Sequence, residues 1–410
     1  MEGTGWYAGH NATGLCTVIT FCYDRLAMPD IGYPNLARWP AKPYTPEWRQ
    51  FDAHWPRTVP LRLTMYLNAA HIPYGVYTVA DAPAGSWYPV AFSWFDFDCN
   101  YFAMLSDDVK LRLRKKEIKI LFYYHEGDNP ERIDQYLNQC RYLDALPDDC
   151  YHIVSANTAA DQLESATYFS EHEFFFRYVN RYQFFDYPLE REYEFTALNR
   201  THKWWRAAVM SDLRVHGVLE NSLWSYNCIS VDDDYEANPV EVDVYDELWR
   251  YRMHEFYLDG PFHCDQFNKH QQNNHHIVNT ELYTQSYFQI VIETHLDADQ
   301  SGGAFITEKT WKPIKYGQPF VVIGTPGTLA ALRSAGYNVF DDVLDNTYDT
   351  IENNTERYIA VRKLLSSMQE QGVADLFKKC QPGIEHNQLN FEARLQSPLN
   401  TLLERLKCLM

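Results

Sequence analysis

The sequence lacks paired cysteines and long apolar runs. Its nine cysteines form no C-x-x-C pair, and their odd number leaves at least one thiol unpaired, which favours a reducing compartment. No stretch of eighteen apolar residues occurs, so no membrane span is expected. The short apolar run at 14–22 follows no basic residue, which disfavours a signal peptide. These absences predict a cytoplasmic protein.

Positive charge is also scarce. The chain carries 36 Lys and Arg against 55 Asp and Glu, a net charge of −19. Such a field repels phosphate backbones, so duplex nucleic acid is not expected as the main partner. Glycine and proline are too few, at 18 and 20 of 410 residues, for a collagen-like or disordered chain. The length predicts roughly two to three domains, and the abundant aromatic residues can serve as core or as stacking platforms.

The hydrophobic pattern predicts two successive α/β units. In the first, strands are expected at 119–124 and 151–155, and helical segments at 130–142 and 158–166. Residues 1–100 are expected to form short strands joined by long loops. In the second unit the expected strands are 195–198, 223–226, 288–292 and 319–323, and the expected helices are 203–215, 307–316 and 328–335. Two amphipathic helices, 357–371 and 389–407, are expected to end the chain.

The predicted fold class is therefore α/β, with two Rossmann-like domains that face each other across a cleft. We expect an N-terminal domain at 1–190, a second domain at 191–355, and C-terminal helices at 356–410 that pack back on the domains. Ligands of such open sheets bind at the carboxyl ends of the strands. Side chains at those ends are therefore the first candidates for a site.

One constellation of such side chains opens the predicted helix at 307–316. Thr307 can cap this helix, and Glu308 and Lys309 follow in its first turn. An acceptor, a cation and free backbone N–H groups would then point the same way, which suits a nucleotide diphosphate. The alternative is a capped amphipathic helix with a surface ion pair, and the spacing alone leaves both interpretations open.

A second constellation follows the predicted strand at 195–198. Asn199 and Arg200 fall at the strand end, and Arg206 comes about two helical turns later. Two guanidinium groups could therefore converge on one anion. The alternative is helix surface charge and an asparagine turn.

Together these segments resemble the donor-site signature of α-1,3-fucosyltransferases. The apolar strand 287–292 ends in Glu293, a loop follows, and then come Thr307-Glu308-Lys309 and Pro319. Asn199 and Arg206 are similar to that family's Ser-Asn-x-x-x-x-x-Arg element. A looser group of viral and bacterial glycosyltransferase-like proteins is also similar. The resemblance covers about residues 195–345.

The resemblance implies the two-domain GT-B fold, with a nucleotide sugar held by the C-terminal half. Arg206 and Lys309 would bind the diphosphate, Glu308 the ribose, and Glu293 the sugar or its neighbouring hydroxyls. The implied donor-binding set is Asn199, Arg200, Arg206, Glu293, Thr307, Glu308 and Lys309. Thr294 stands where the family has Asn, and Leu198 where it has Ser. These two differences leave the donor sugar and base open, with a GDP-linked sugar as one candidate.

The resemblance also implies a carboxylate base in the N-terminal half. The run from Ile120 to Glu126 is similar to the family's short strand that ends in Gly-Glu-Asn, which makes Glu126 the candidate base, with His125 beside it. One base would deprotonate the attacking hydroxyl while cations stabilise the departing diphosphate. The alternative is that Glu126 only complements a helix dipole. The reserve bases are Asp96, Asp98 and Asp128.

Two further clusters could hold a metal. Asp232-Asp233-Asp234 could bind Mg²⁺ or Mn²⁺ against a donor diphosphate, and imidazoles and a carboxylate of the next loop could bind a transition metal. The residues of that loop are His263, Asp265, His270, His275 and His276. A solvated acidic face and a polar loop are the favoured interpretations, and the cations at 206 and 309 make a metal unnecessary.

These observations predict a glycosyltransferase that moves a sugar from a nucleotide donor to a hydroxyl of a glycan or another acceptor. The reaction is expected to be inverting and metal-independent, with no cofactor beyond the nucleotide sugar. The alternative is a non-catalytic carbohydrate-binding or virion-associated protein that retains the fold. Acceptor, linkage and oligomeric state are left open.

Overall fold

The structure, a computed structural model, describes part of the chain in two compact units. It describes residues 19–24, 62–92, 97, 100–178, 188–199, 203–226, 255–256, 258–262, 278–297, 301–394 and 397–410. The first unit takes the described residues up to 178, with 301–302 and 397–410, and the second takes 188–297 and 303–394. None of the helices in these ranges combines the length and apolarity needed to cross a bilayer.

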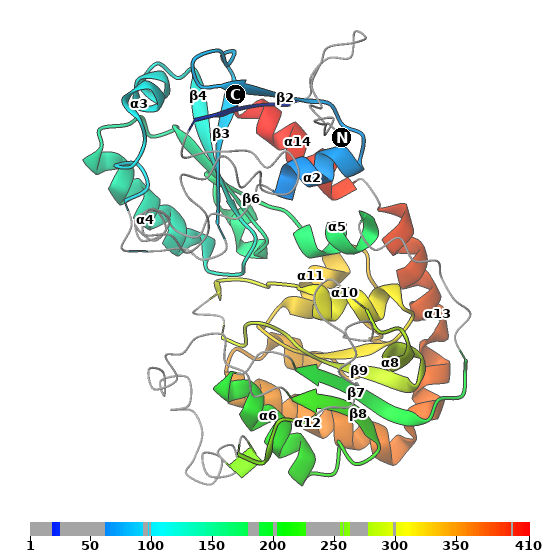
Figure 1. Ribbon diagram of the computed structural model, residues 1–410. Coiled ribbons are helices and arrows are strands. Elements are labelled where there is room, and N and C mark those ends of the chain that lie inside the picture. The colour runs from blue at the N-terminus through cyan, green and yellow to red at the C-terminus, as the bar shows by residue number, and fades with distance from the viewer. Residues whose placement is uncertain are drawn as a thin grey trace, which may run out of the picture. The chain divides into compact units, whose positions relative to one another are not determined.

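The first unit contains an all-parallel sheet in the order β2-β1-β3-β4-β5-β6. Figure 1 shows α3 and α4 on one face of this sheet and α2 and α14 on the other. The strands are β1 (Ile19–Tyr23), β2 (Tyr74–Thr78), β3 (Ser86–Phe92), β4 (Ile118–Tyr124), β5 (Tyr151–Ser155) and β6 (Ala166–Tyr168). The helices are α2 (Arg62–Ala69), α3 (Asp107–Arg114), α4 (Pro130–Leu143), the short 3₁₀ helix η2 (Thr158–Gln162), α5 (Glu171–Tyr178) and α14 (Ser397–Cys408).

The expected strands β4 and β5 and the start of α4 are confirmed in this unit. Pro130 occupies the first turn of α4, and the side chain of Asn129 caps it by accepting from the N–H of Glu131. The helical segment expected at 158–166 is confirmed only in its first part, as the 3₁₀ helix η2, because the chain adds to the sheet as β6 from Ala166. Hydrogen bonding to β5 decides this segment, and no local pattern shows it.

The second unit contains a smaller all-parallel sheet in the order β10-β9-β7-β8. Figure 1 shows α6 and α12 on one face of this sheet and α10 on the other. The strands are β7 (Tyr193–Asn199), β8 (Ser222–Tyr226), β9 (Ser286–Ile292) and β10 (Phe320–Ile323). The helices are α6 (Trp204–Val215), α8 (Glu281–Thr284), α10 (Glu308–Lys315), α11 (Thr328–Ser334), the 3₁₀ helix η4 (Thr347–Thr350), α12 (Asn354–Gln371) and α13 (Val373–Ala393). All four strands and three helices expected here are confirmed.

The C-terminal region differs from the expectation of one helix at 389–407. Two helices form instead, α13 and α14, and they belong to the second and first unit respectively. Proline disfavours a helix interior, yet Pro382 lies inside α13 and is followed by Gly383. A Cβ at Gly383 would come within 3.0 Å of Asn338 and Phe340, so the glycine permits α13 to pack closely on these two residues.

Both sheets share one strand order, which defines where a ligand site is expected. Numbered within each unit, the strands run second, first, third, fourth, so the winding reverses between the first and third strands. Ligands of open parallel sheets bind outside the carboxyl ends of the strands at this reversal. In the second unit the reversal lies between β7 and β9, which end at Asn199 and Ile292.

Candidate anion site at the ends of β7 and β9

Asn199 lies at this reversal point with an unsatisfied side chain. It is the last residue of β7 and only 1% exposed, and neither its Nδ2 nor its Oδ1 has a hydrogen-bond partner among the described residues. A buried amide without partners costs about 1–3 kcal/mol. The side chain therefore has unused hydrogen-bonding capacity at the strand end where a ligand is expected.

Cations from two separate segments meet at the end of β9. The Nη2 atom of Arg206, in the first turn of α6, donates to the carbonyl oxygen of Glu293 at 2.7 Å. The Nζ atom of Lys203 donates to the carbonyl oxygen of Thr294 at 3.0 Å, and that of Lys309 donates to the Thr294 hydroxyl at 3.1 Å. The structure thus brings together Arg206 and Lys309, which sequence analysis paired, and adds Lys203.

The first turn of α10 carries the expected cap. Thr307 precedes the helix in an extended conformation, and its hydroxyl accepts from the N–H of Lys309 at 3.4 Å. A carboxylate oxygen of Glu308 lies 3.3 Å from the Nζ atom of Lys309, and both side chains are partly buried. This ion pair is the one that the alternative interpretation expected, but it lies beside Arg206 and Lys203 rather than alone.

The Glu293 carboxylate makes contacts that sequence analysis did not expect. Glu293 is 1% exposed and accepts four hydrogen bonds, two at each oxygen. The donors are the N–H of Thr294, the N–H and hydroxyl of Thr307, and the hydroxyl of Thr310. The direct sugar contact stays a prediction, and the observed contacts join the end of β9 to the first turn of α10.

His295 lies buried close to the cationic cluster, and its pKa is lowered. Burial, followed by the charges of Lys203, Arg206 and Lys309, lowers the pKa of His295 to about 3. Its ring lies 5.7 Å from that of Phe305, centroid to centroid. At neutral pH the imidazole is therefore uncharged, and the positive charges of the cluster are those of the lysines and the arginine.

The lowered pKa of His295 predicts a loss of stability in acid. The unfolded chain binds a proton near pH 6.5 and the folded chain only near pH 3, so this contribution is complete above pH 6.5 and is lost as the pH falls toward 3. Between pH 7 and 5, urea unfolding should show a decrease on the order of 1–2 kcal/mol that His295→Gln removes. The exposed His386 provides the control, His386→Gln. An unchanged decrease in His295→Gln would contradict the assignment.

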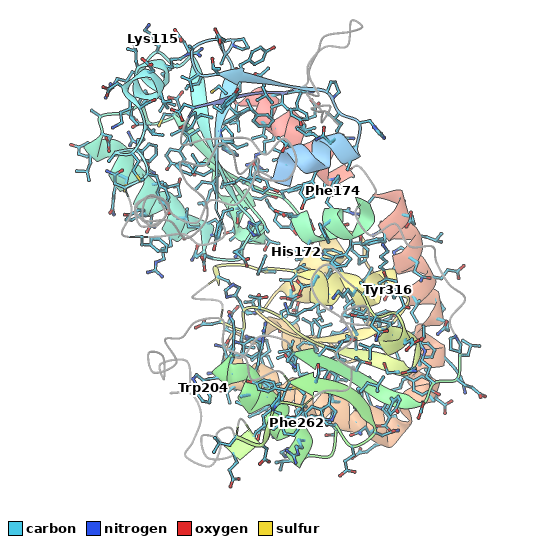
Figure 2. All side chains as sticks on the ribbon, viewed as in Figure 1. Lys115, His172, Phe174, Trp204, Phe262 and Tyr316 are labelled. Atoms are coloured by element: carbon cyan, nitrogen blue, oxygen red, sulfur yellow. The ribbon has the colours of Figure 1, made fainter. Side chains whose placement is uncertain are left out.

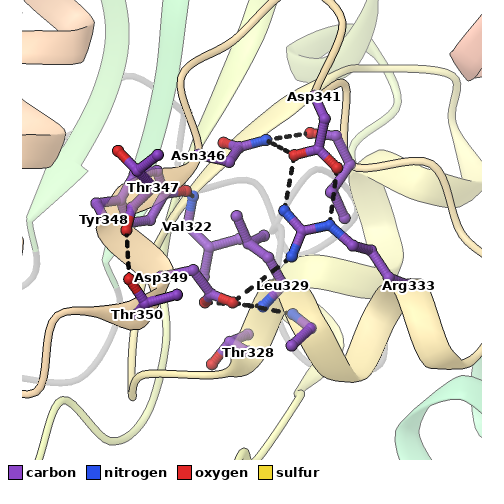
Figure 3. Close-up of polar contacts among 12 residues, drawn as sticks. Val322, Thr328, Leu329, Arg333, Asp341, Asn346, Thr347, Tyr348, Asp349 and Thr350 are labelled. Carbon is purple, nitrogen blue, oxygen red and sulfur yellow. Dashed lines mark hydrogen bonds and ion pairs between the residues drawn. The ribbon is translucent and has the colours of Figure 1, made fainter.

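The helices α6 and α11, which follow β7 and β10, differ at their N-termini. No side chain caps α6 within the described residues, and Figure 2 labels Trp204 at this end of the helix. At α11, by contrast, the Asp349 carboxylate accepts from the N–H groups of Leu329 and Ala330 at 3.0 and 2.9 Å (Figure 3). A protein carboxylate thus occupies the anion position of α11, whereas the α6 terminus adds its positive dipole to the cationic cluster.

Glu126 lies in the first unit, in the loop after β4. Its Oε1 atom is 3.6 Å from Nε2 of His125, and its side chain is 38% exposed. The neighbouring Asp128 accepts a hydrogen bond from the Tyr124 hydroxyl, and burial together with the charges of Asp128 and Glu126 raises the pKa of Tyr124. Asn157, the residue before η2, donates to the carbonyl oxygen of Gly127 at 2.8 Å and so holds this loop. Glu126 is thus an accessible carboxylate at a strand end.

Several predicted residues lie outside the described part of the chain. They are Arg200, Asp96, Asp98, Asp232 to Asp234, His263, Asp265, His270, His275 and His276. Among the residues that the structure does describe, no group of three His, Cys, Asp or Glu side chains could hold a metal ion.

Sequence analysis missed three residues of the site. Lys203 precedes Arg206 by three positions, a spacing that places both on one side of a helix start, and that signal could have found it. His295 and Thr310 offered no such signal, because their roles depend on contacts between the end of β9 and α10.

Comparisons with known proteins do not assign the chain to a family. No family model and no curated protein matches the chain. One similar solved structure is described as the crystal structure of an alpha1,3-fucosyltransferase, with 11% sequence identity, 87% of this chain and 86% of that chain covered, and a TM-score of 0.29. The α/β class and the two Rossmann-like units rest on the strand orders described above.

Proposed function

We propose that the chain is a glycosyltransferase whose second unit binds the diphosphate of a nucleotide-sugar donor. One observation supports this most: Arg206, Lys203 and Lys309 meet at the end of β9, at the point where the strand order reverses. A diphosphate carries the charge that three such cations would neutralise. The unsatisfied amide of Asn199 at the neighbouring strand end supplies further hydrogen bonds.

The proposed reaction is an inverting displacement. The acceptor oxygen attacks the anomeric carbon, the bond from that carbon to the diphosphate oxygen breaks, and the diphosphate leaves with the bonding electrons. Glu126 takes the proton of the acceptor hydroxyl, and the cations of the second unit stabilise the charge that develops on the leaving group. Glu308 is proposed to bind the ribose, and its departure from Lys309 would free that ammonium for phosphate.

We propose no metal for this step, because side chains can supply the positive charge. Activity that persists in excess chelator would support this, and activity that chelator abolishes would redirect attention to Asp232 to Asp234. The donor is proposed to be a sugar nucleotide with a GDP-linked sugar as first candidate, and the acceptor a glycan or another hydroxyl compound. A cytoplasmic location and a GT-B arrangement of the two units belong to the same proposal.

Asn199→Leu should separate stability from binding. Leucine has the same branched shape and number of side-chain heavy atoms as asparagine and removes two buried groups that lack partners, so the free energy of unfolding without ligand should stay unchanged or rise by up to about 1 kcal/mol. Binding of GDP or UDP should weaken, because the ligand loses the amide. Urea unfolding with and without nucleotide measures both effects. A destabilised variant that binds nucleotide as well as the wild type would show that the amide serves only the fold.

A panel of nucleotide sugars tests the function itself. We expect slow hydrolysis of at least one donor without acceptor, together with thermal stabilisation by the corresponding nucleoside diphosphate. The double variant Arg206→Ala and Lys309→Ala is the control and should show neither effect. If the folded wild type hydrolyses no donor and no nucleotide stabilises it, the non-catalytic carbohydrate-binding or virion-associated alternative is favoured.

A further inference from the structure

The Glu293 carboxylate is fully occupied by its own protein neighbours. Oε1 accepts from the N–H of Thr307 at 3.0 Å and from the hydroxyl of Thr310 at 2.6 Å. Oε2 accepts from the hydroxyl of Thr307 at 2.6 Å and from the N–H of Thr294 at 3.2 Å. A carboxylate offers about four acceptor positions, and all four are used here. No position is left for a sugar hydroxyl in this arrangement.

This arrangement fixes the direction of the Thr307 hydroxyl. Because an ionised carboxylate can only accept, the hydroxyl proton of Thr307 points at Glu293. Both lone pairs of that oxygen then face Lys309: one accepts from its backbone N–H at 3.4 Å and the other from its Nζ atom at 3.1 Å. The carboxylate thus determines which groups the Thr307 oxygen can accept from.

The second hydroxyl on the ammonium of Lys309 belongs to Thr294. Its Oγ1 atom accepts from Nζ at 3.1 Å, and the backbone N–H of the same residue donates to Glu293. Both threonines that hold the ammonium are therefore bound to one buried carboxylate. Thr310 follows Lys309 in α10 and is 0% exposed, and its hydroxyl donates to the same carboxylate.

We infer that Glu293 and Thr310 are positioning residues that hold the Lys309 ammonium at the end of β9, and that Glu293 does not contact the donor sugar. The inference rests on the proposed function, because it assigns the ammonium to the donor diphosphate. It replaces the expected direct contact between Glu293 and the sugar by an indirect action on the phosphates.

Three ligands, in which first a diphosphate and then a sugar is added to the nucleoside, separate an action on the phosphates from a contact with the sugar. Guanosine, GDP and GDP-fucose, or the uridine series if UDP stabilises the protein, are titrated into the wild type, Glu293→Gln and Thr310→Val. In Glu293→Gln an amide NH₂ group replaces one carboxylate oxygen, so an acceptor of the protein donors is lost. This change disturbs the Thr307 hydroxyl that holds the Lys309 ammonium. We expect the affinity for GDP and for GDP-fucose to fall by the same factor, about tenfold, while guanosine binding is unchanged. Thr310→Ser, which keeps the hydroxyl, should bind all three ligands like the wild type.

Each other result overturns the inference in a recognisable way. A loss confined to GDP-fucose would show that Glu293 contacts the sugar. An equal loss for guanosine would show a general structural role, and wild-type affinities in both variants would show no role at all. Thr310→Val provides a second test if Glu293→Gln fails to fold. If the wild type binds neither GDP nor UDP, the proposed function is itself contradicted and the inference falls with it.

Discussion

Lys309→Ala is expected to weaken nucleoside diphosphate binding by roughly 10- to 150-fold, which corresponds to about 1.5–3 kcal/mol for a hydrogen bond to a charged group. The side chain lies at the end of β9, where two threonine hydroxyls hold its ammonium beside Arg206 and Lys203. Its removal leaves the diphosphate with one cation fewer. Arg206→Ala should act in the same direction, since its guanidinium reaches the same strand end. Isothermal titration calorimetry measures both effects.

The matched control for Lys309→Ala is Lys378→Ala. Lys378 lies on α13 of the same unit and forms an exposed ion pair with Asp375, so its removal changes the net charge equally without touching the site. We expect wild-type affinity in this variant. If both variants lose affinity to the same extent, the effect is a long-range one of net charge, and the assignment of Lys309 to the diphosphate is wrong.

Glu126→Gln is expected to abolish transfer while leaving donor affinity nearly intact. A general base contributes about 10²- to 10⁴-fold to the rate, and glutamine keeps the size of the side chain but cannot take a proton. The carboxylate lies after β4 with 38% of its side chain exposed, so an acceptor can reach it. Single-turnover transfer assays with saturating donor measure the rate, and calorimetry measures the affinity.

The competing interpretation of Glu126 predicts a different result. A carboxylate that only complements the dipole of α4 contributes about 0.3–1 kcal/mol to stability and nothing to transfer. Glu131→Gln, in the first turn of the same helix, is the control for that electrostatic effect. Transfer at the wild-type rate in Glu126→Gln would direct the search to Asp128, Asp96 or Asp98.

Most strands and helices could be predicted because their cause is local. The apolar runs of β4, β5, β9 and β10 are short and bounded by turn residues, and the caps of α4 and α10 are visible in the sequence. The errors arose where tertiary contacts decide. β6 forms by pairing with β5, and α13 continues through Pro382, where Gly383 packs closely on Asn338 and Phe340.

The residues of the candidate site could likewise be predicted in part from the sequence. Asn199, Arg206 and Lys309 could be found because Asn199 ends a strand and the two cations lie in the first turns of α6 and α10, and the strand order brings the ends of β7 and β9 together. The contacts of Glu293 could not be found, since its four donors come from α10 and from its own loop. Sequence spacing indicates which residues share an edge of a sheet, but not which of them bind one another there.

The most direct test of the account is the structure of the protein with a bound nucleoside diphosphate. We expect the phosphates to lie outside the carboxyl ends of β7 and β9, with oxygens about 2.7–2.9 Å from the Lys309 ammonium and from a nitrogen of Arg206, and the Asn199 amide to be hydrogen-bonded to the ligand. A nucleotide bound elsewhere on the chain, with these three side chains left as they are now, would contradict it.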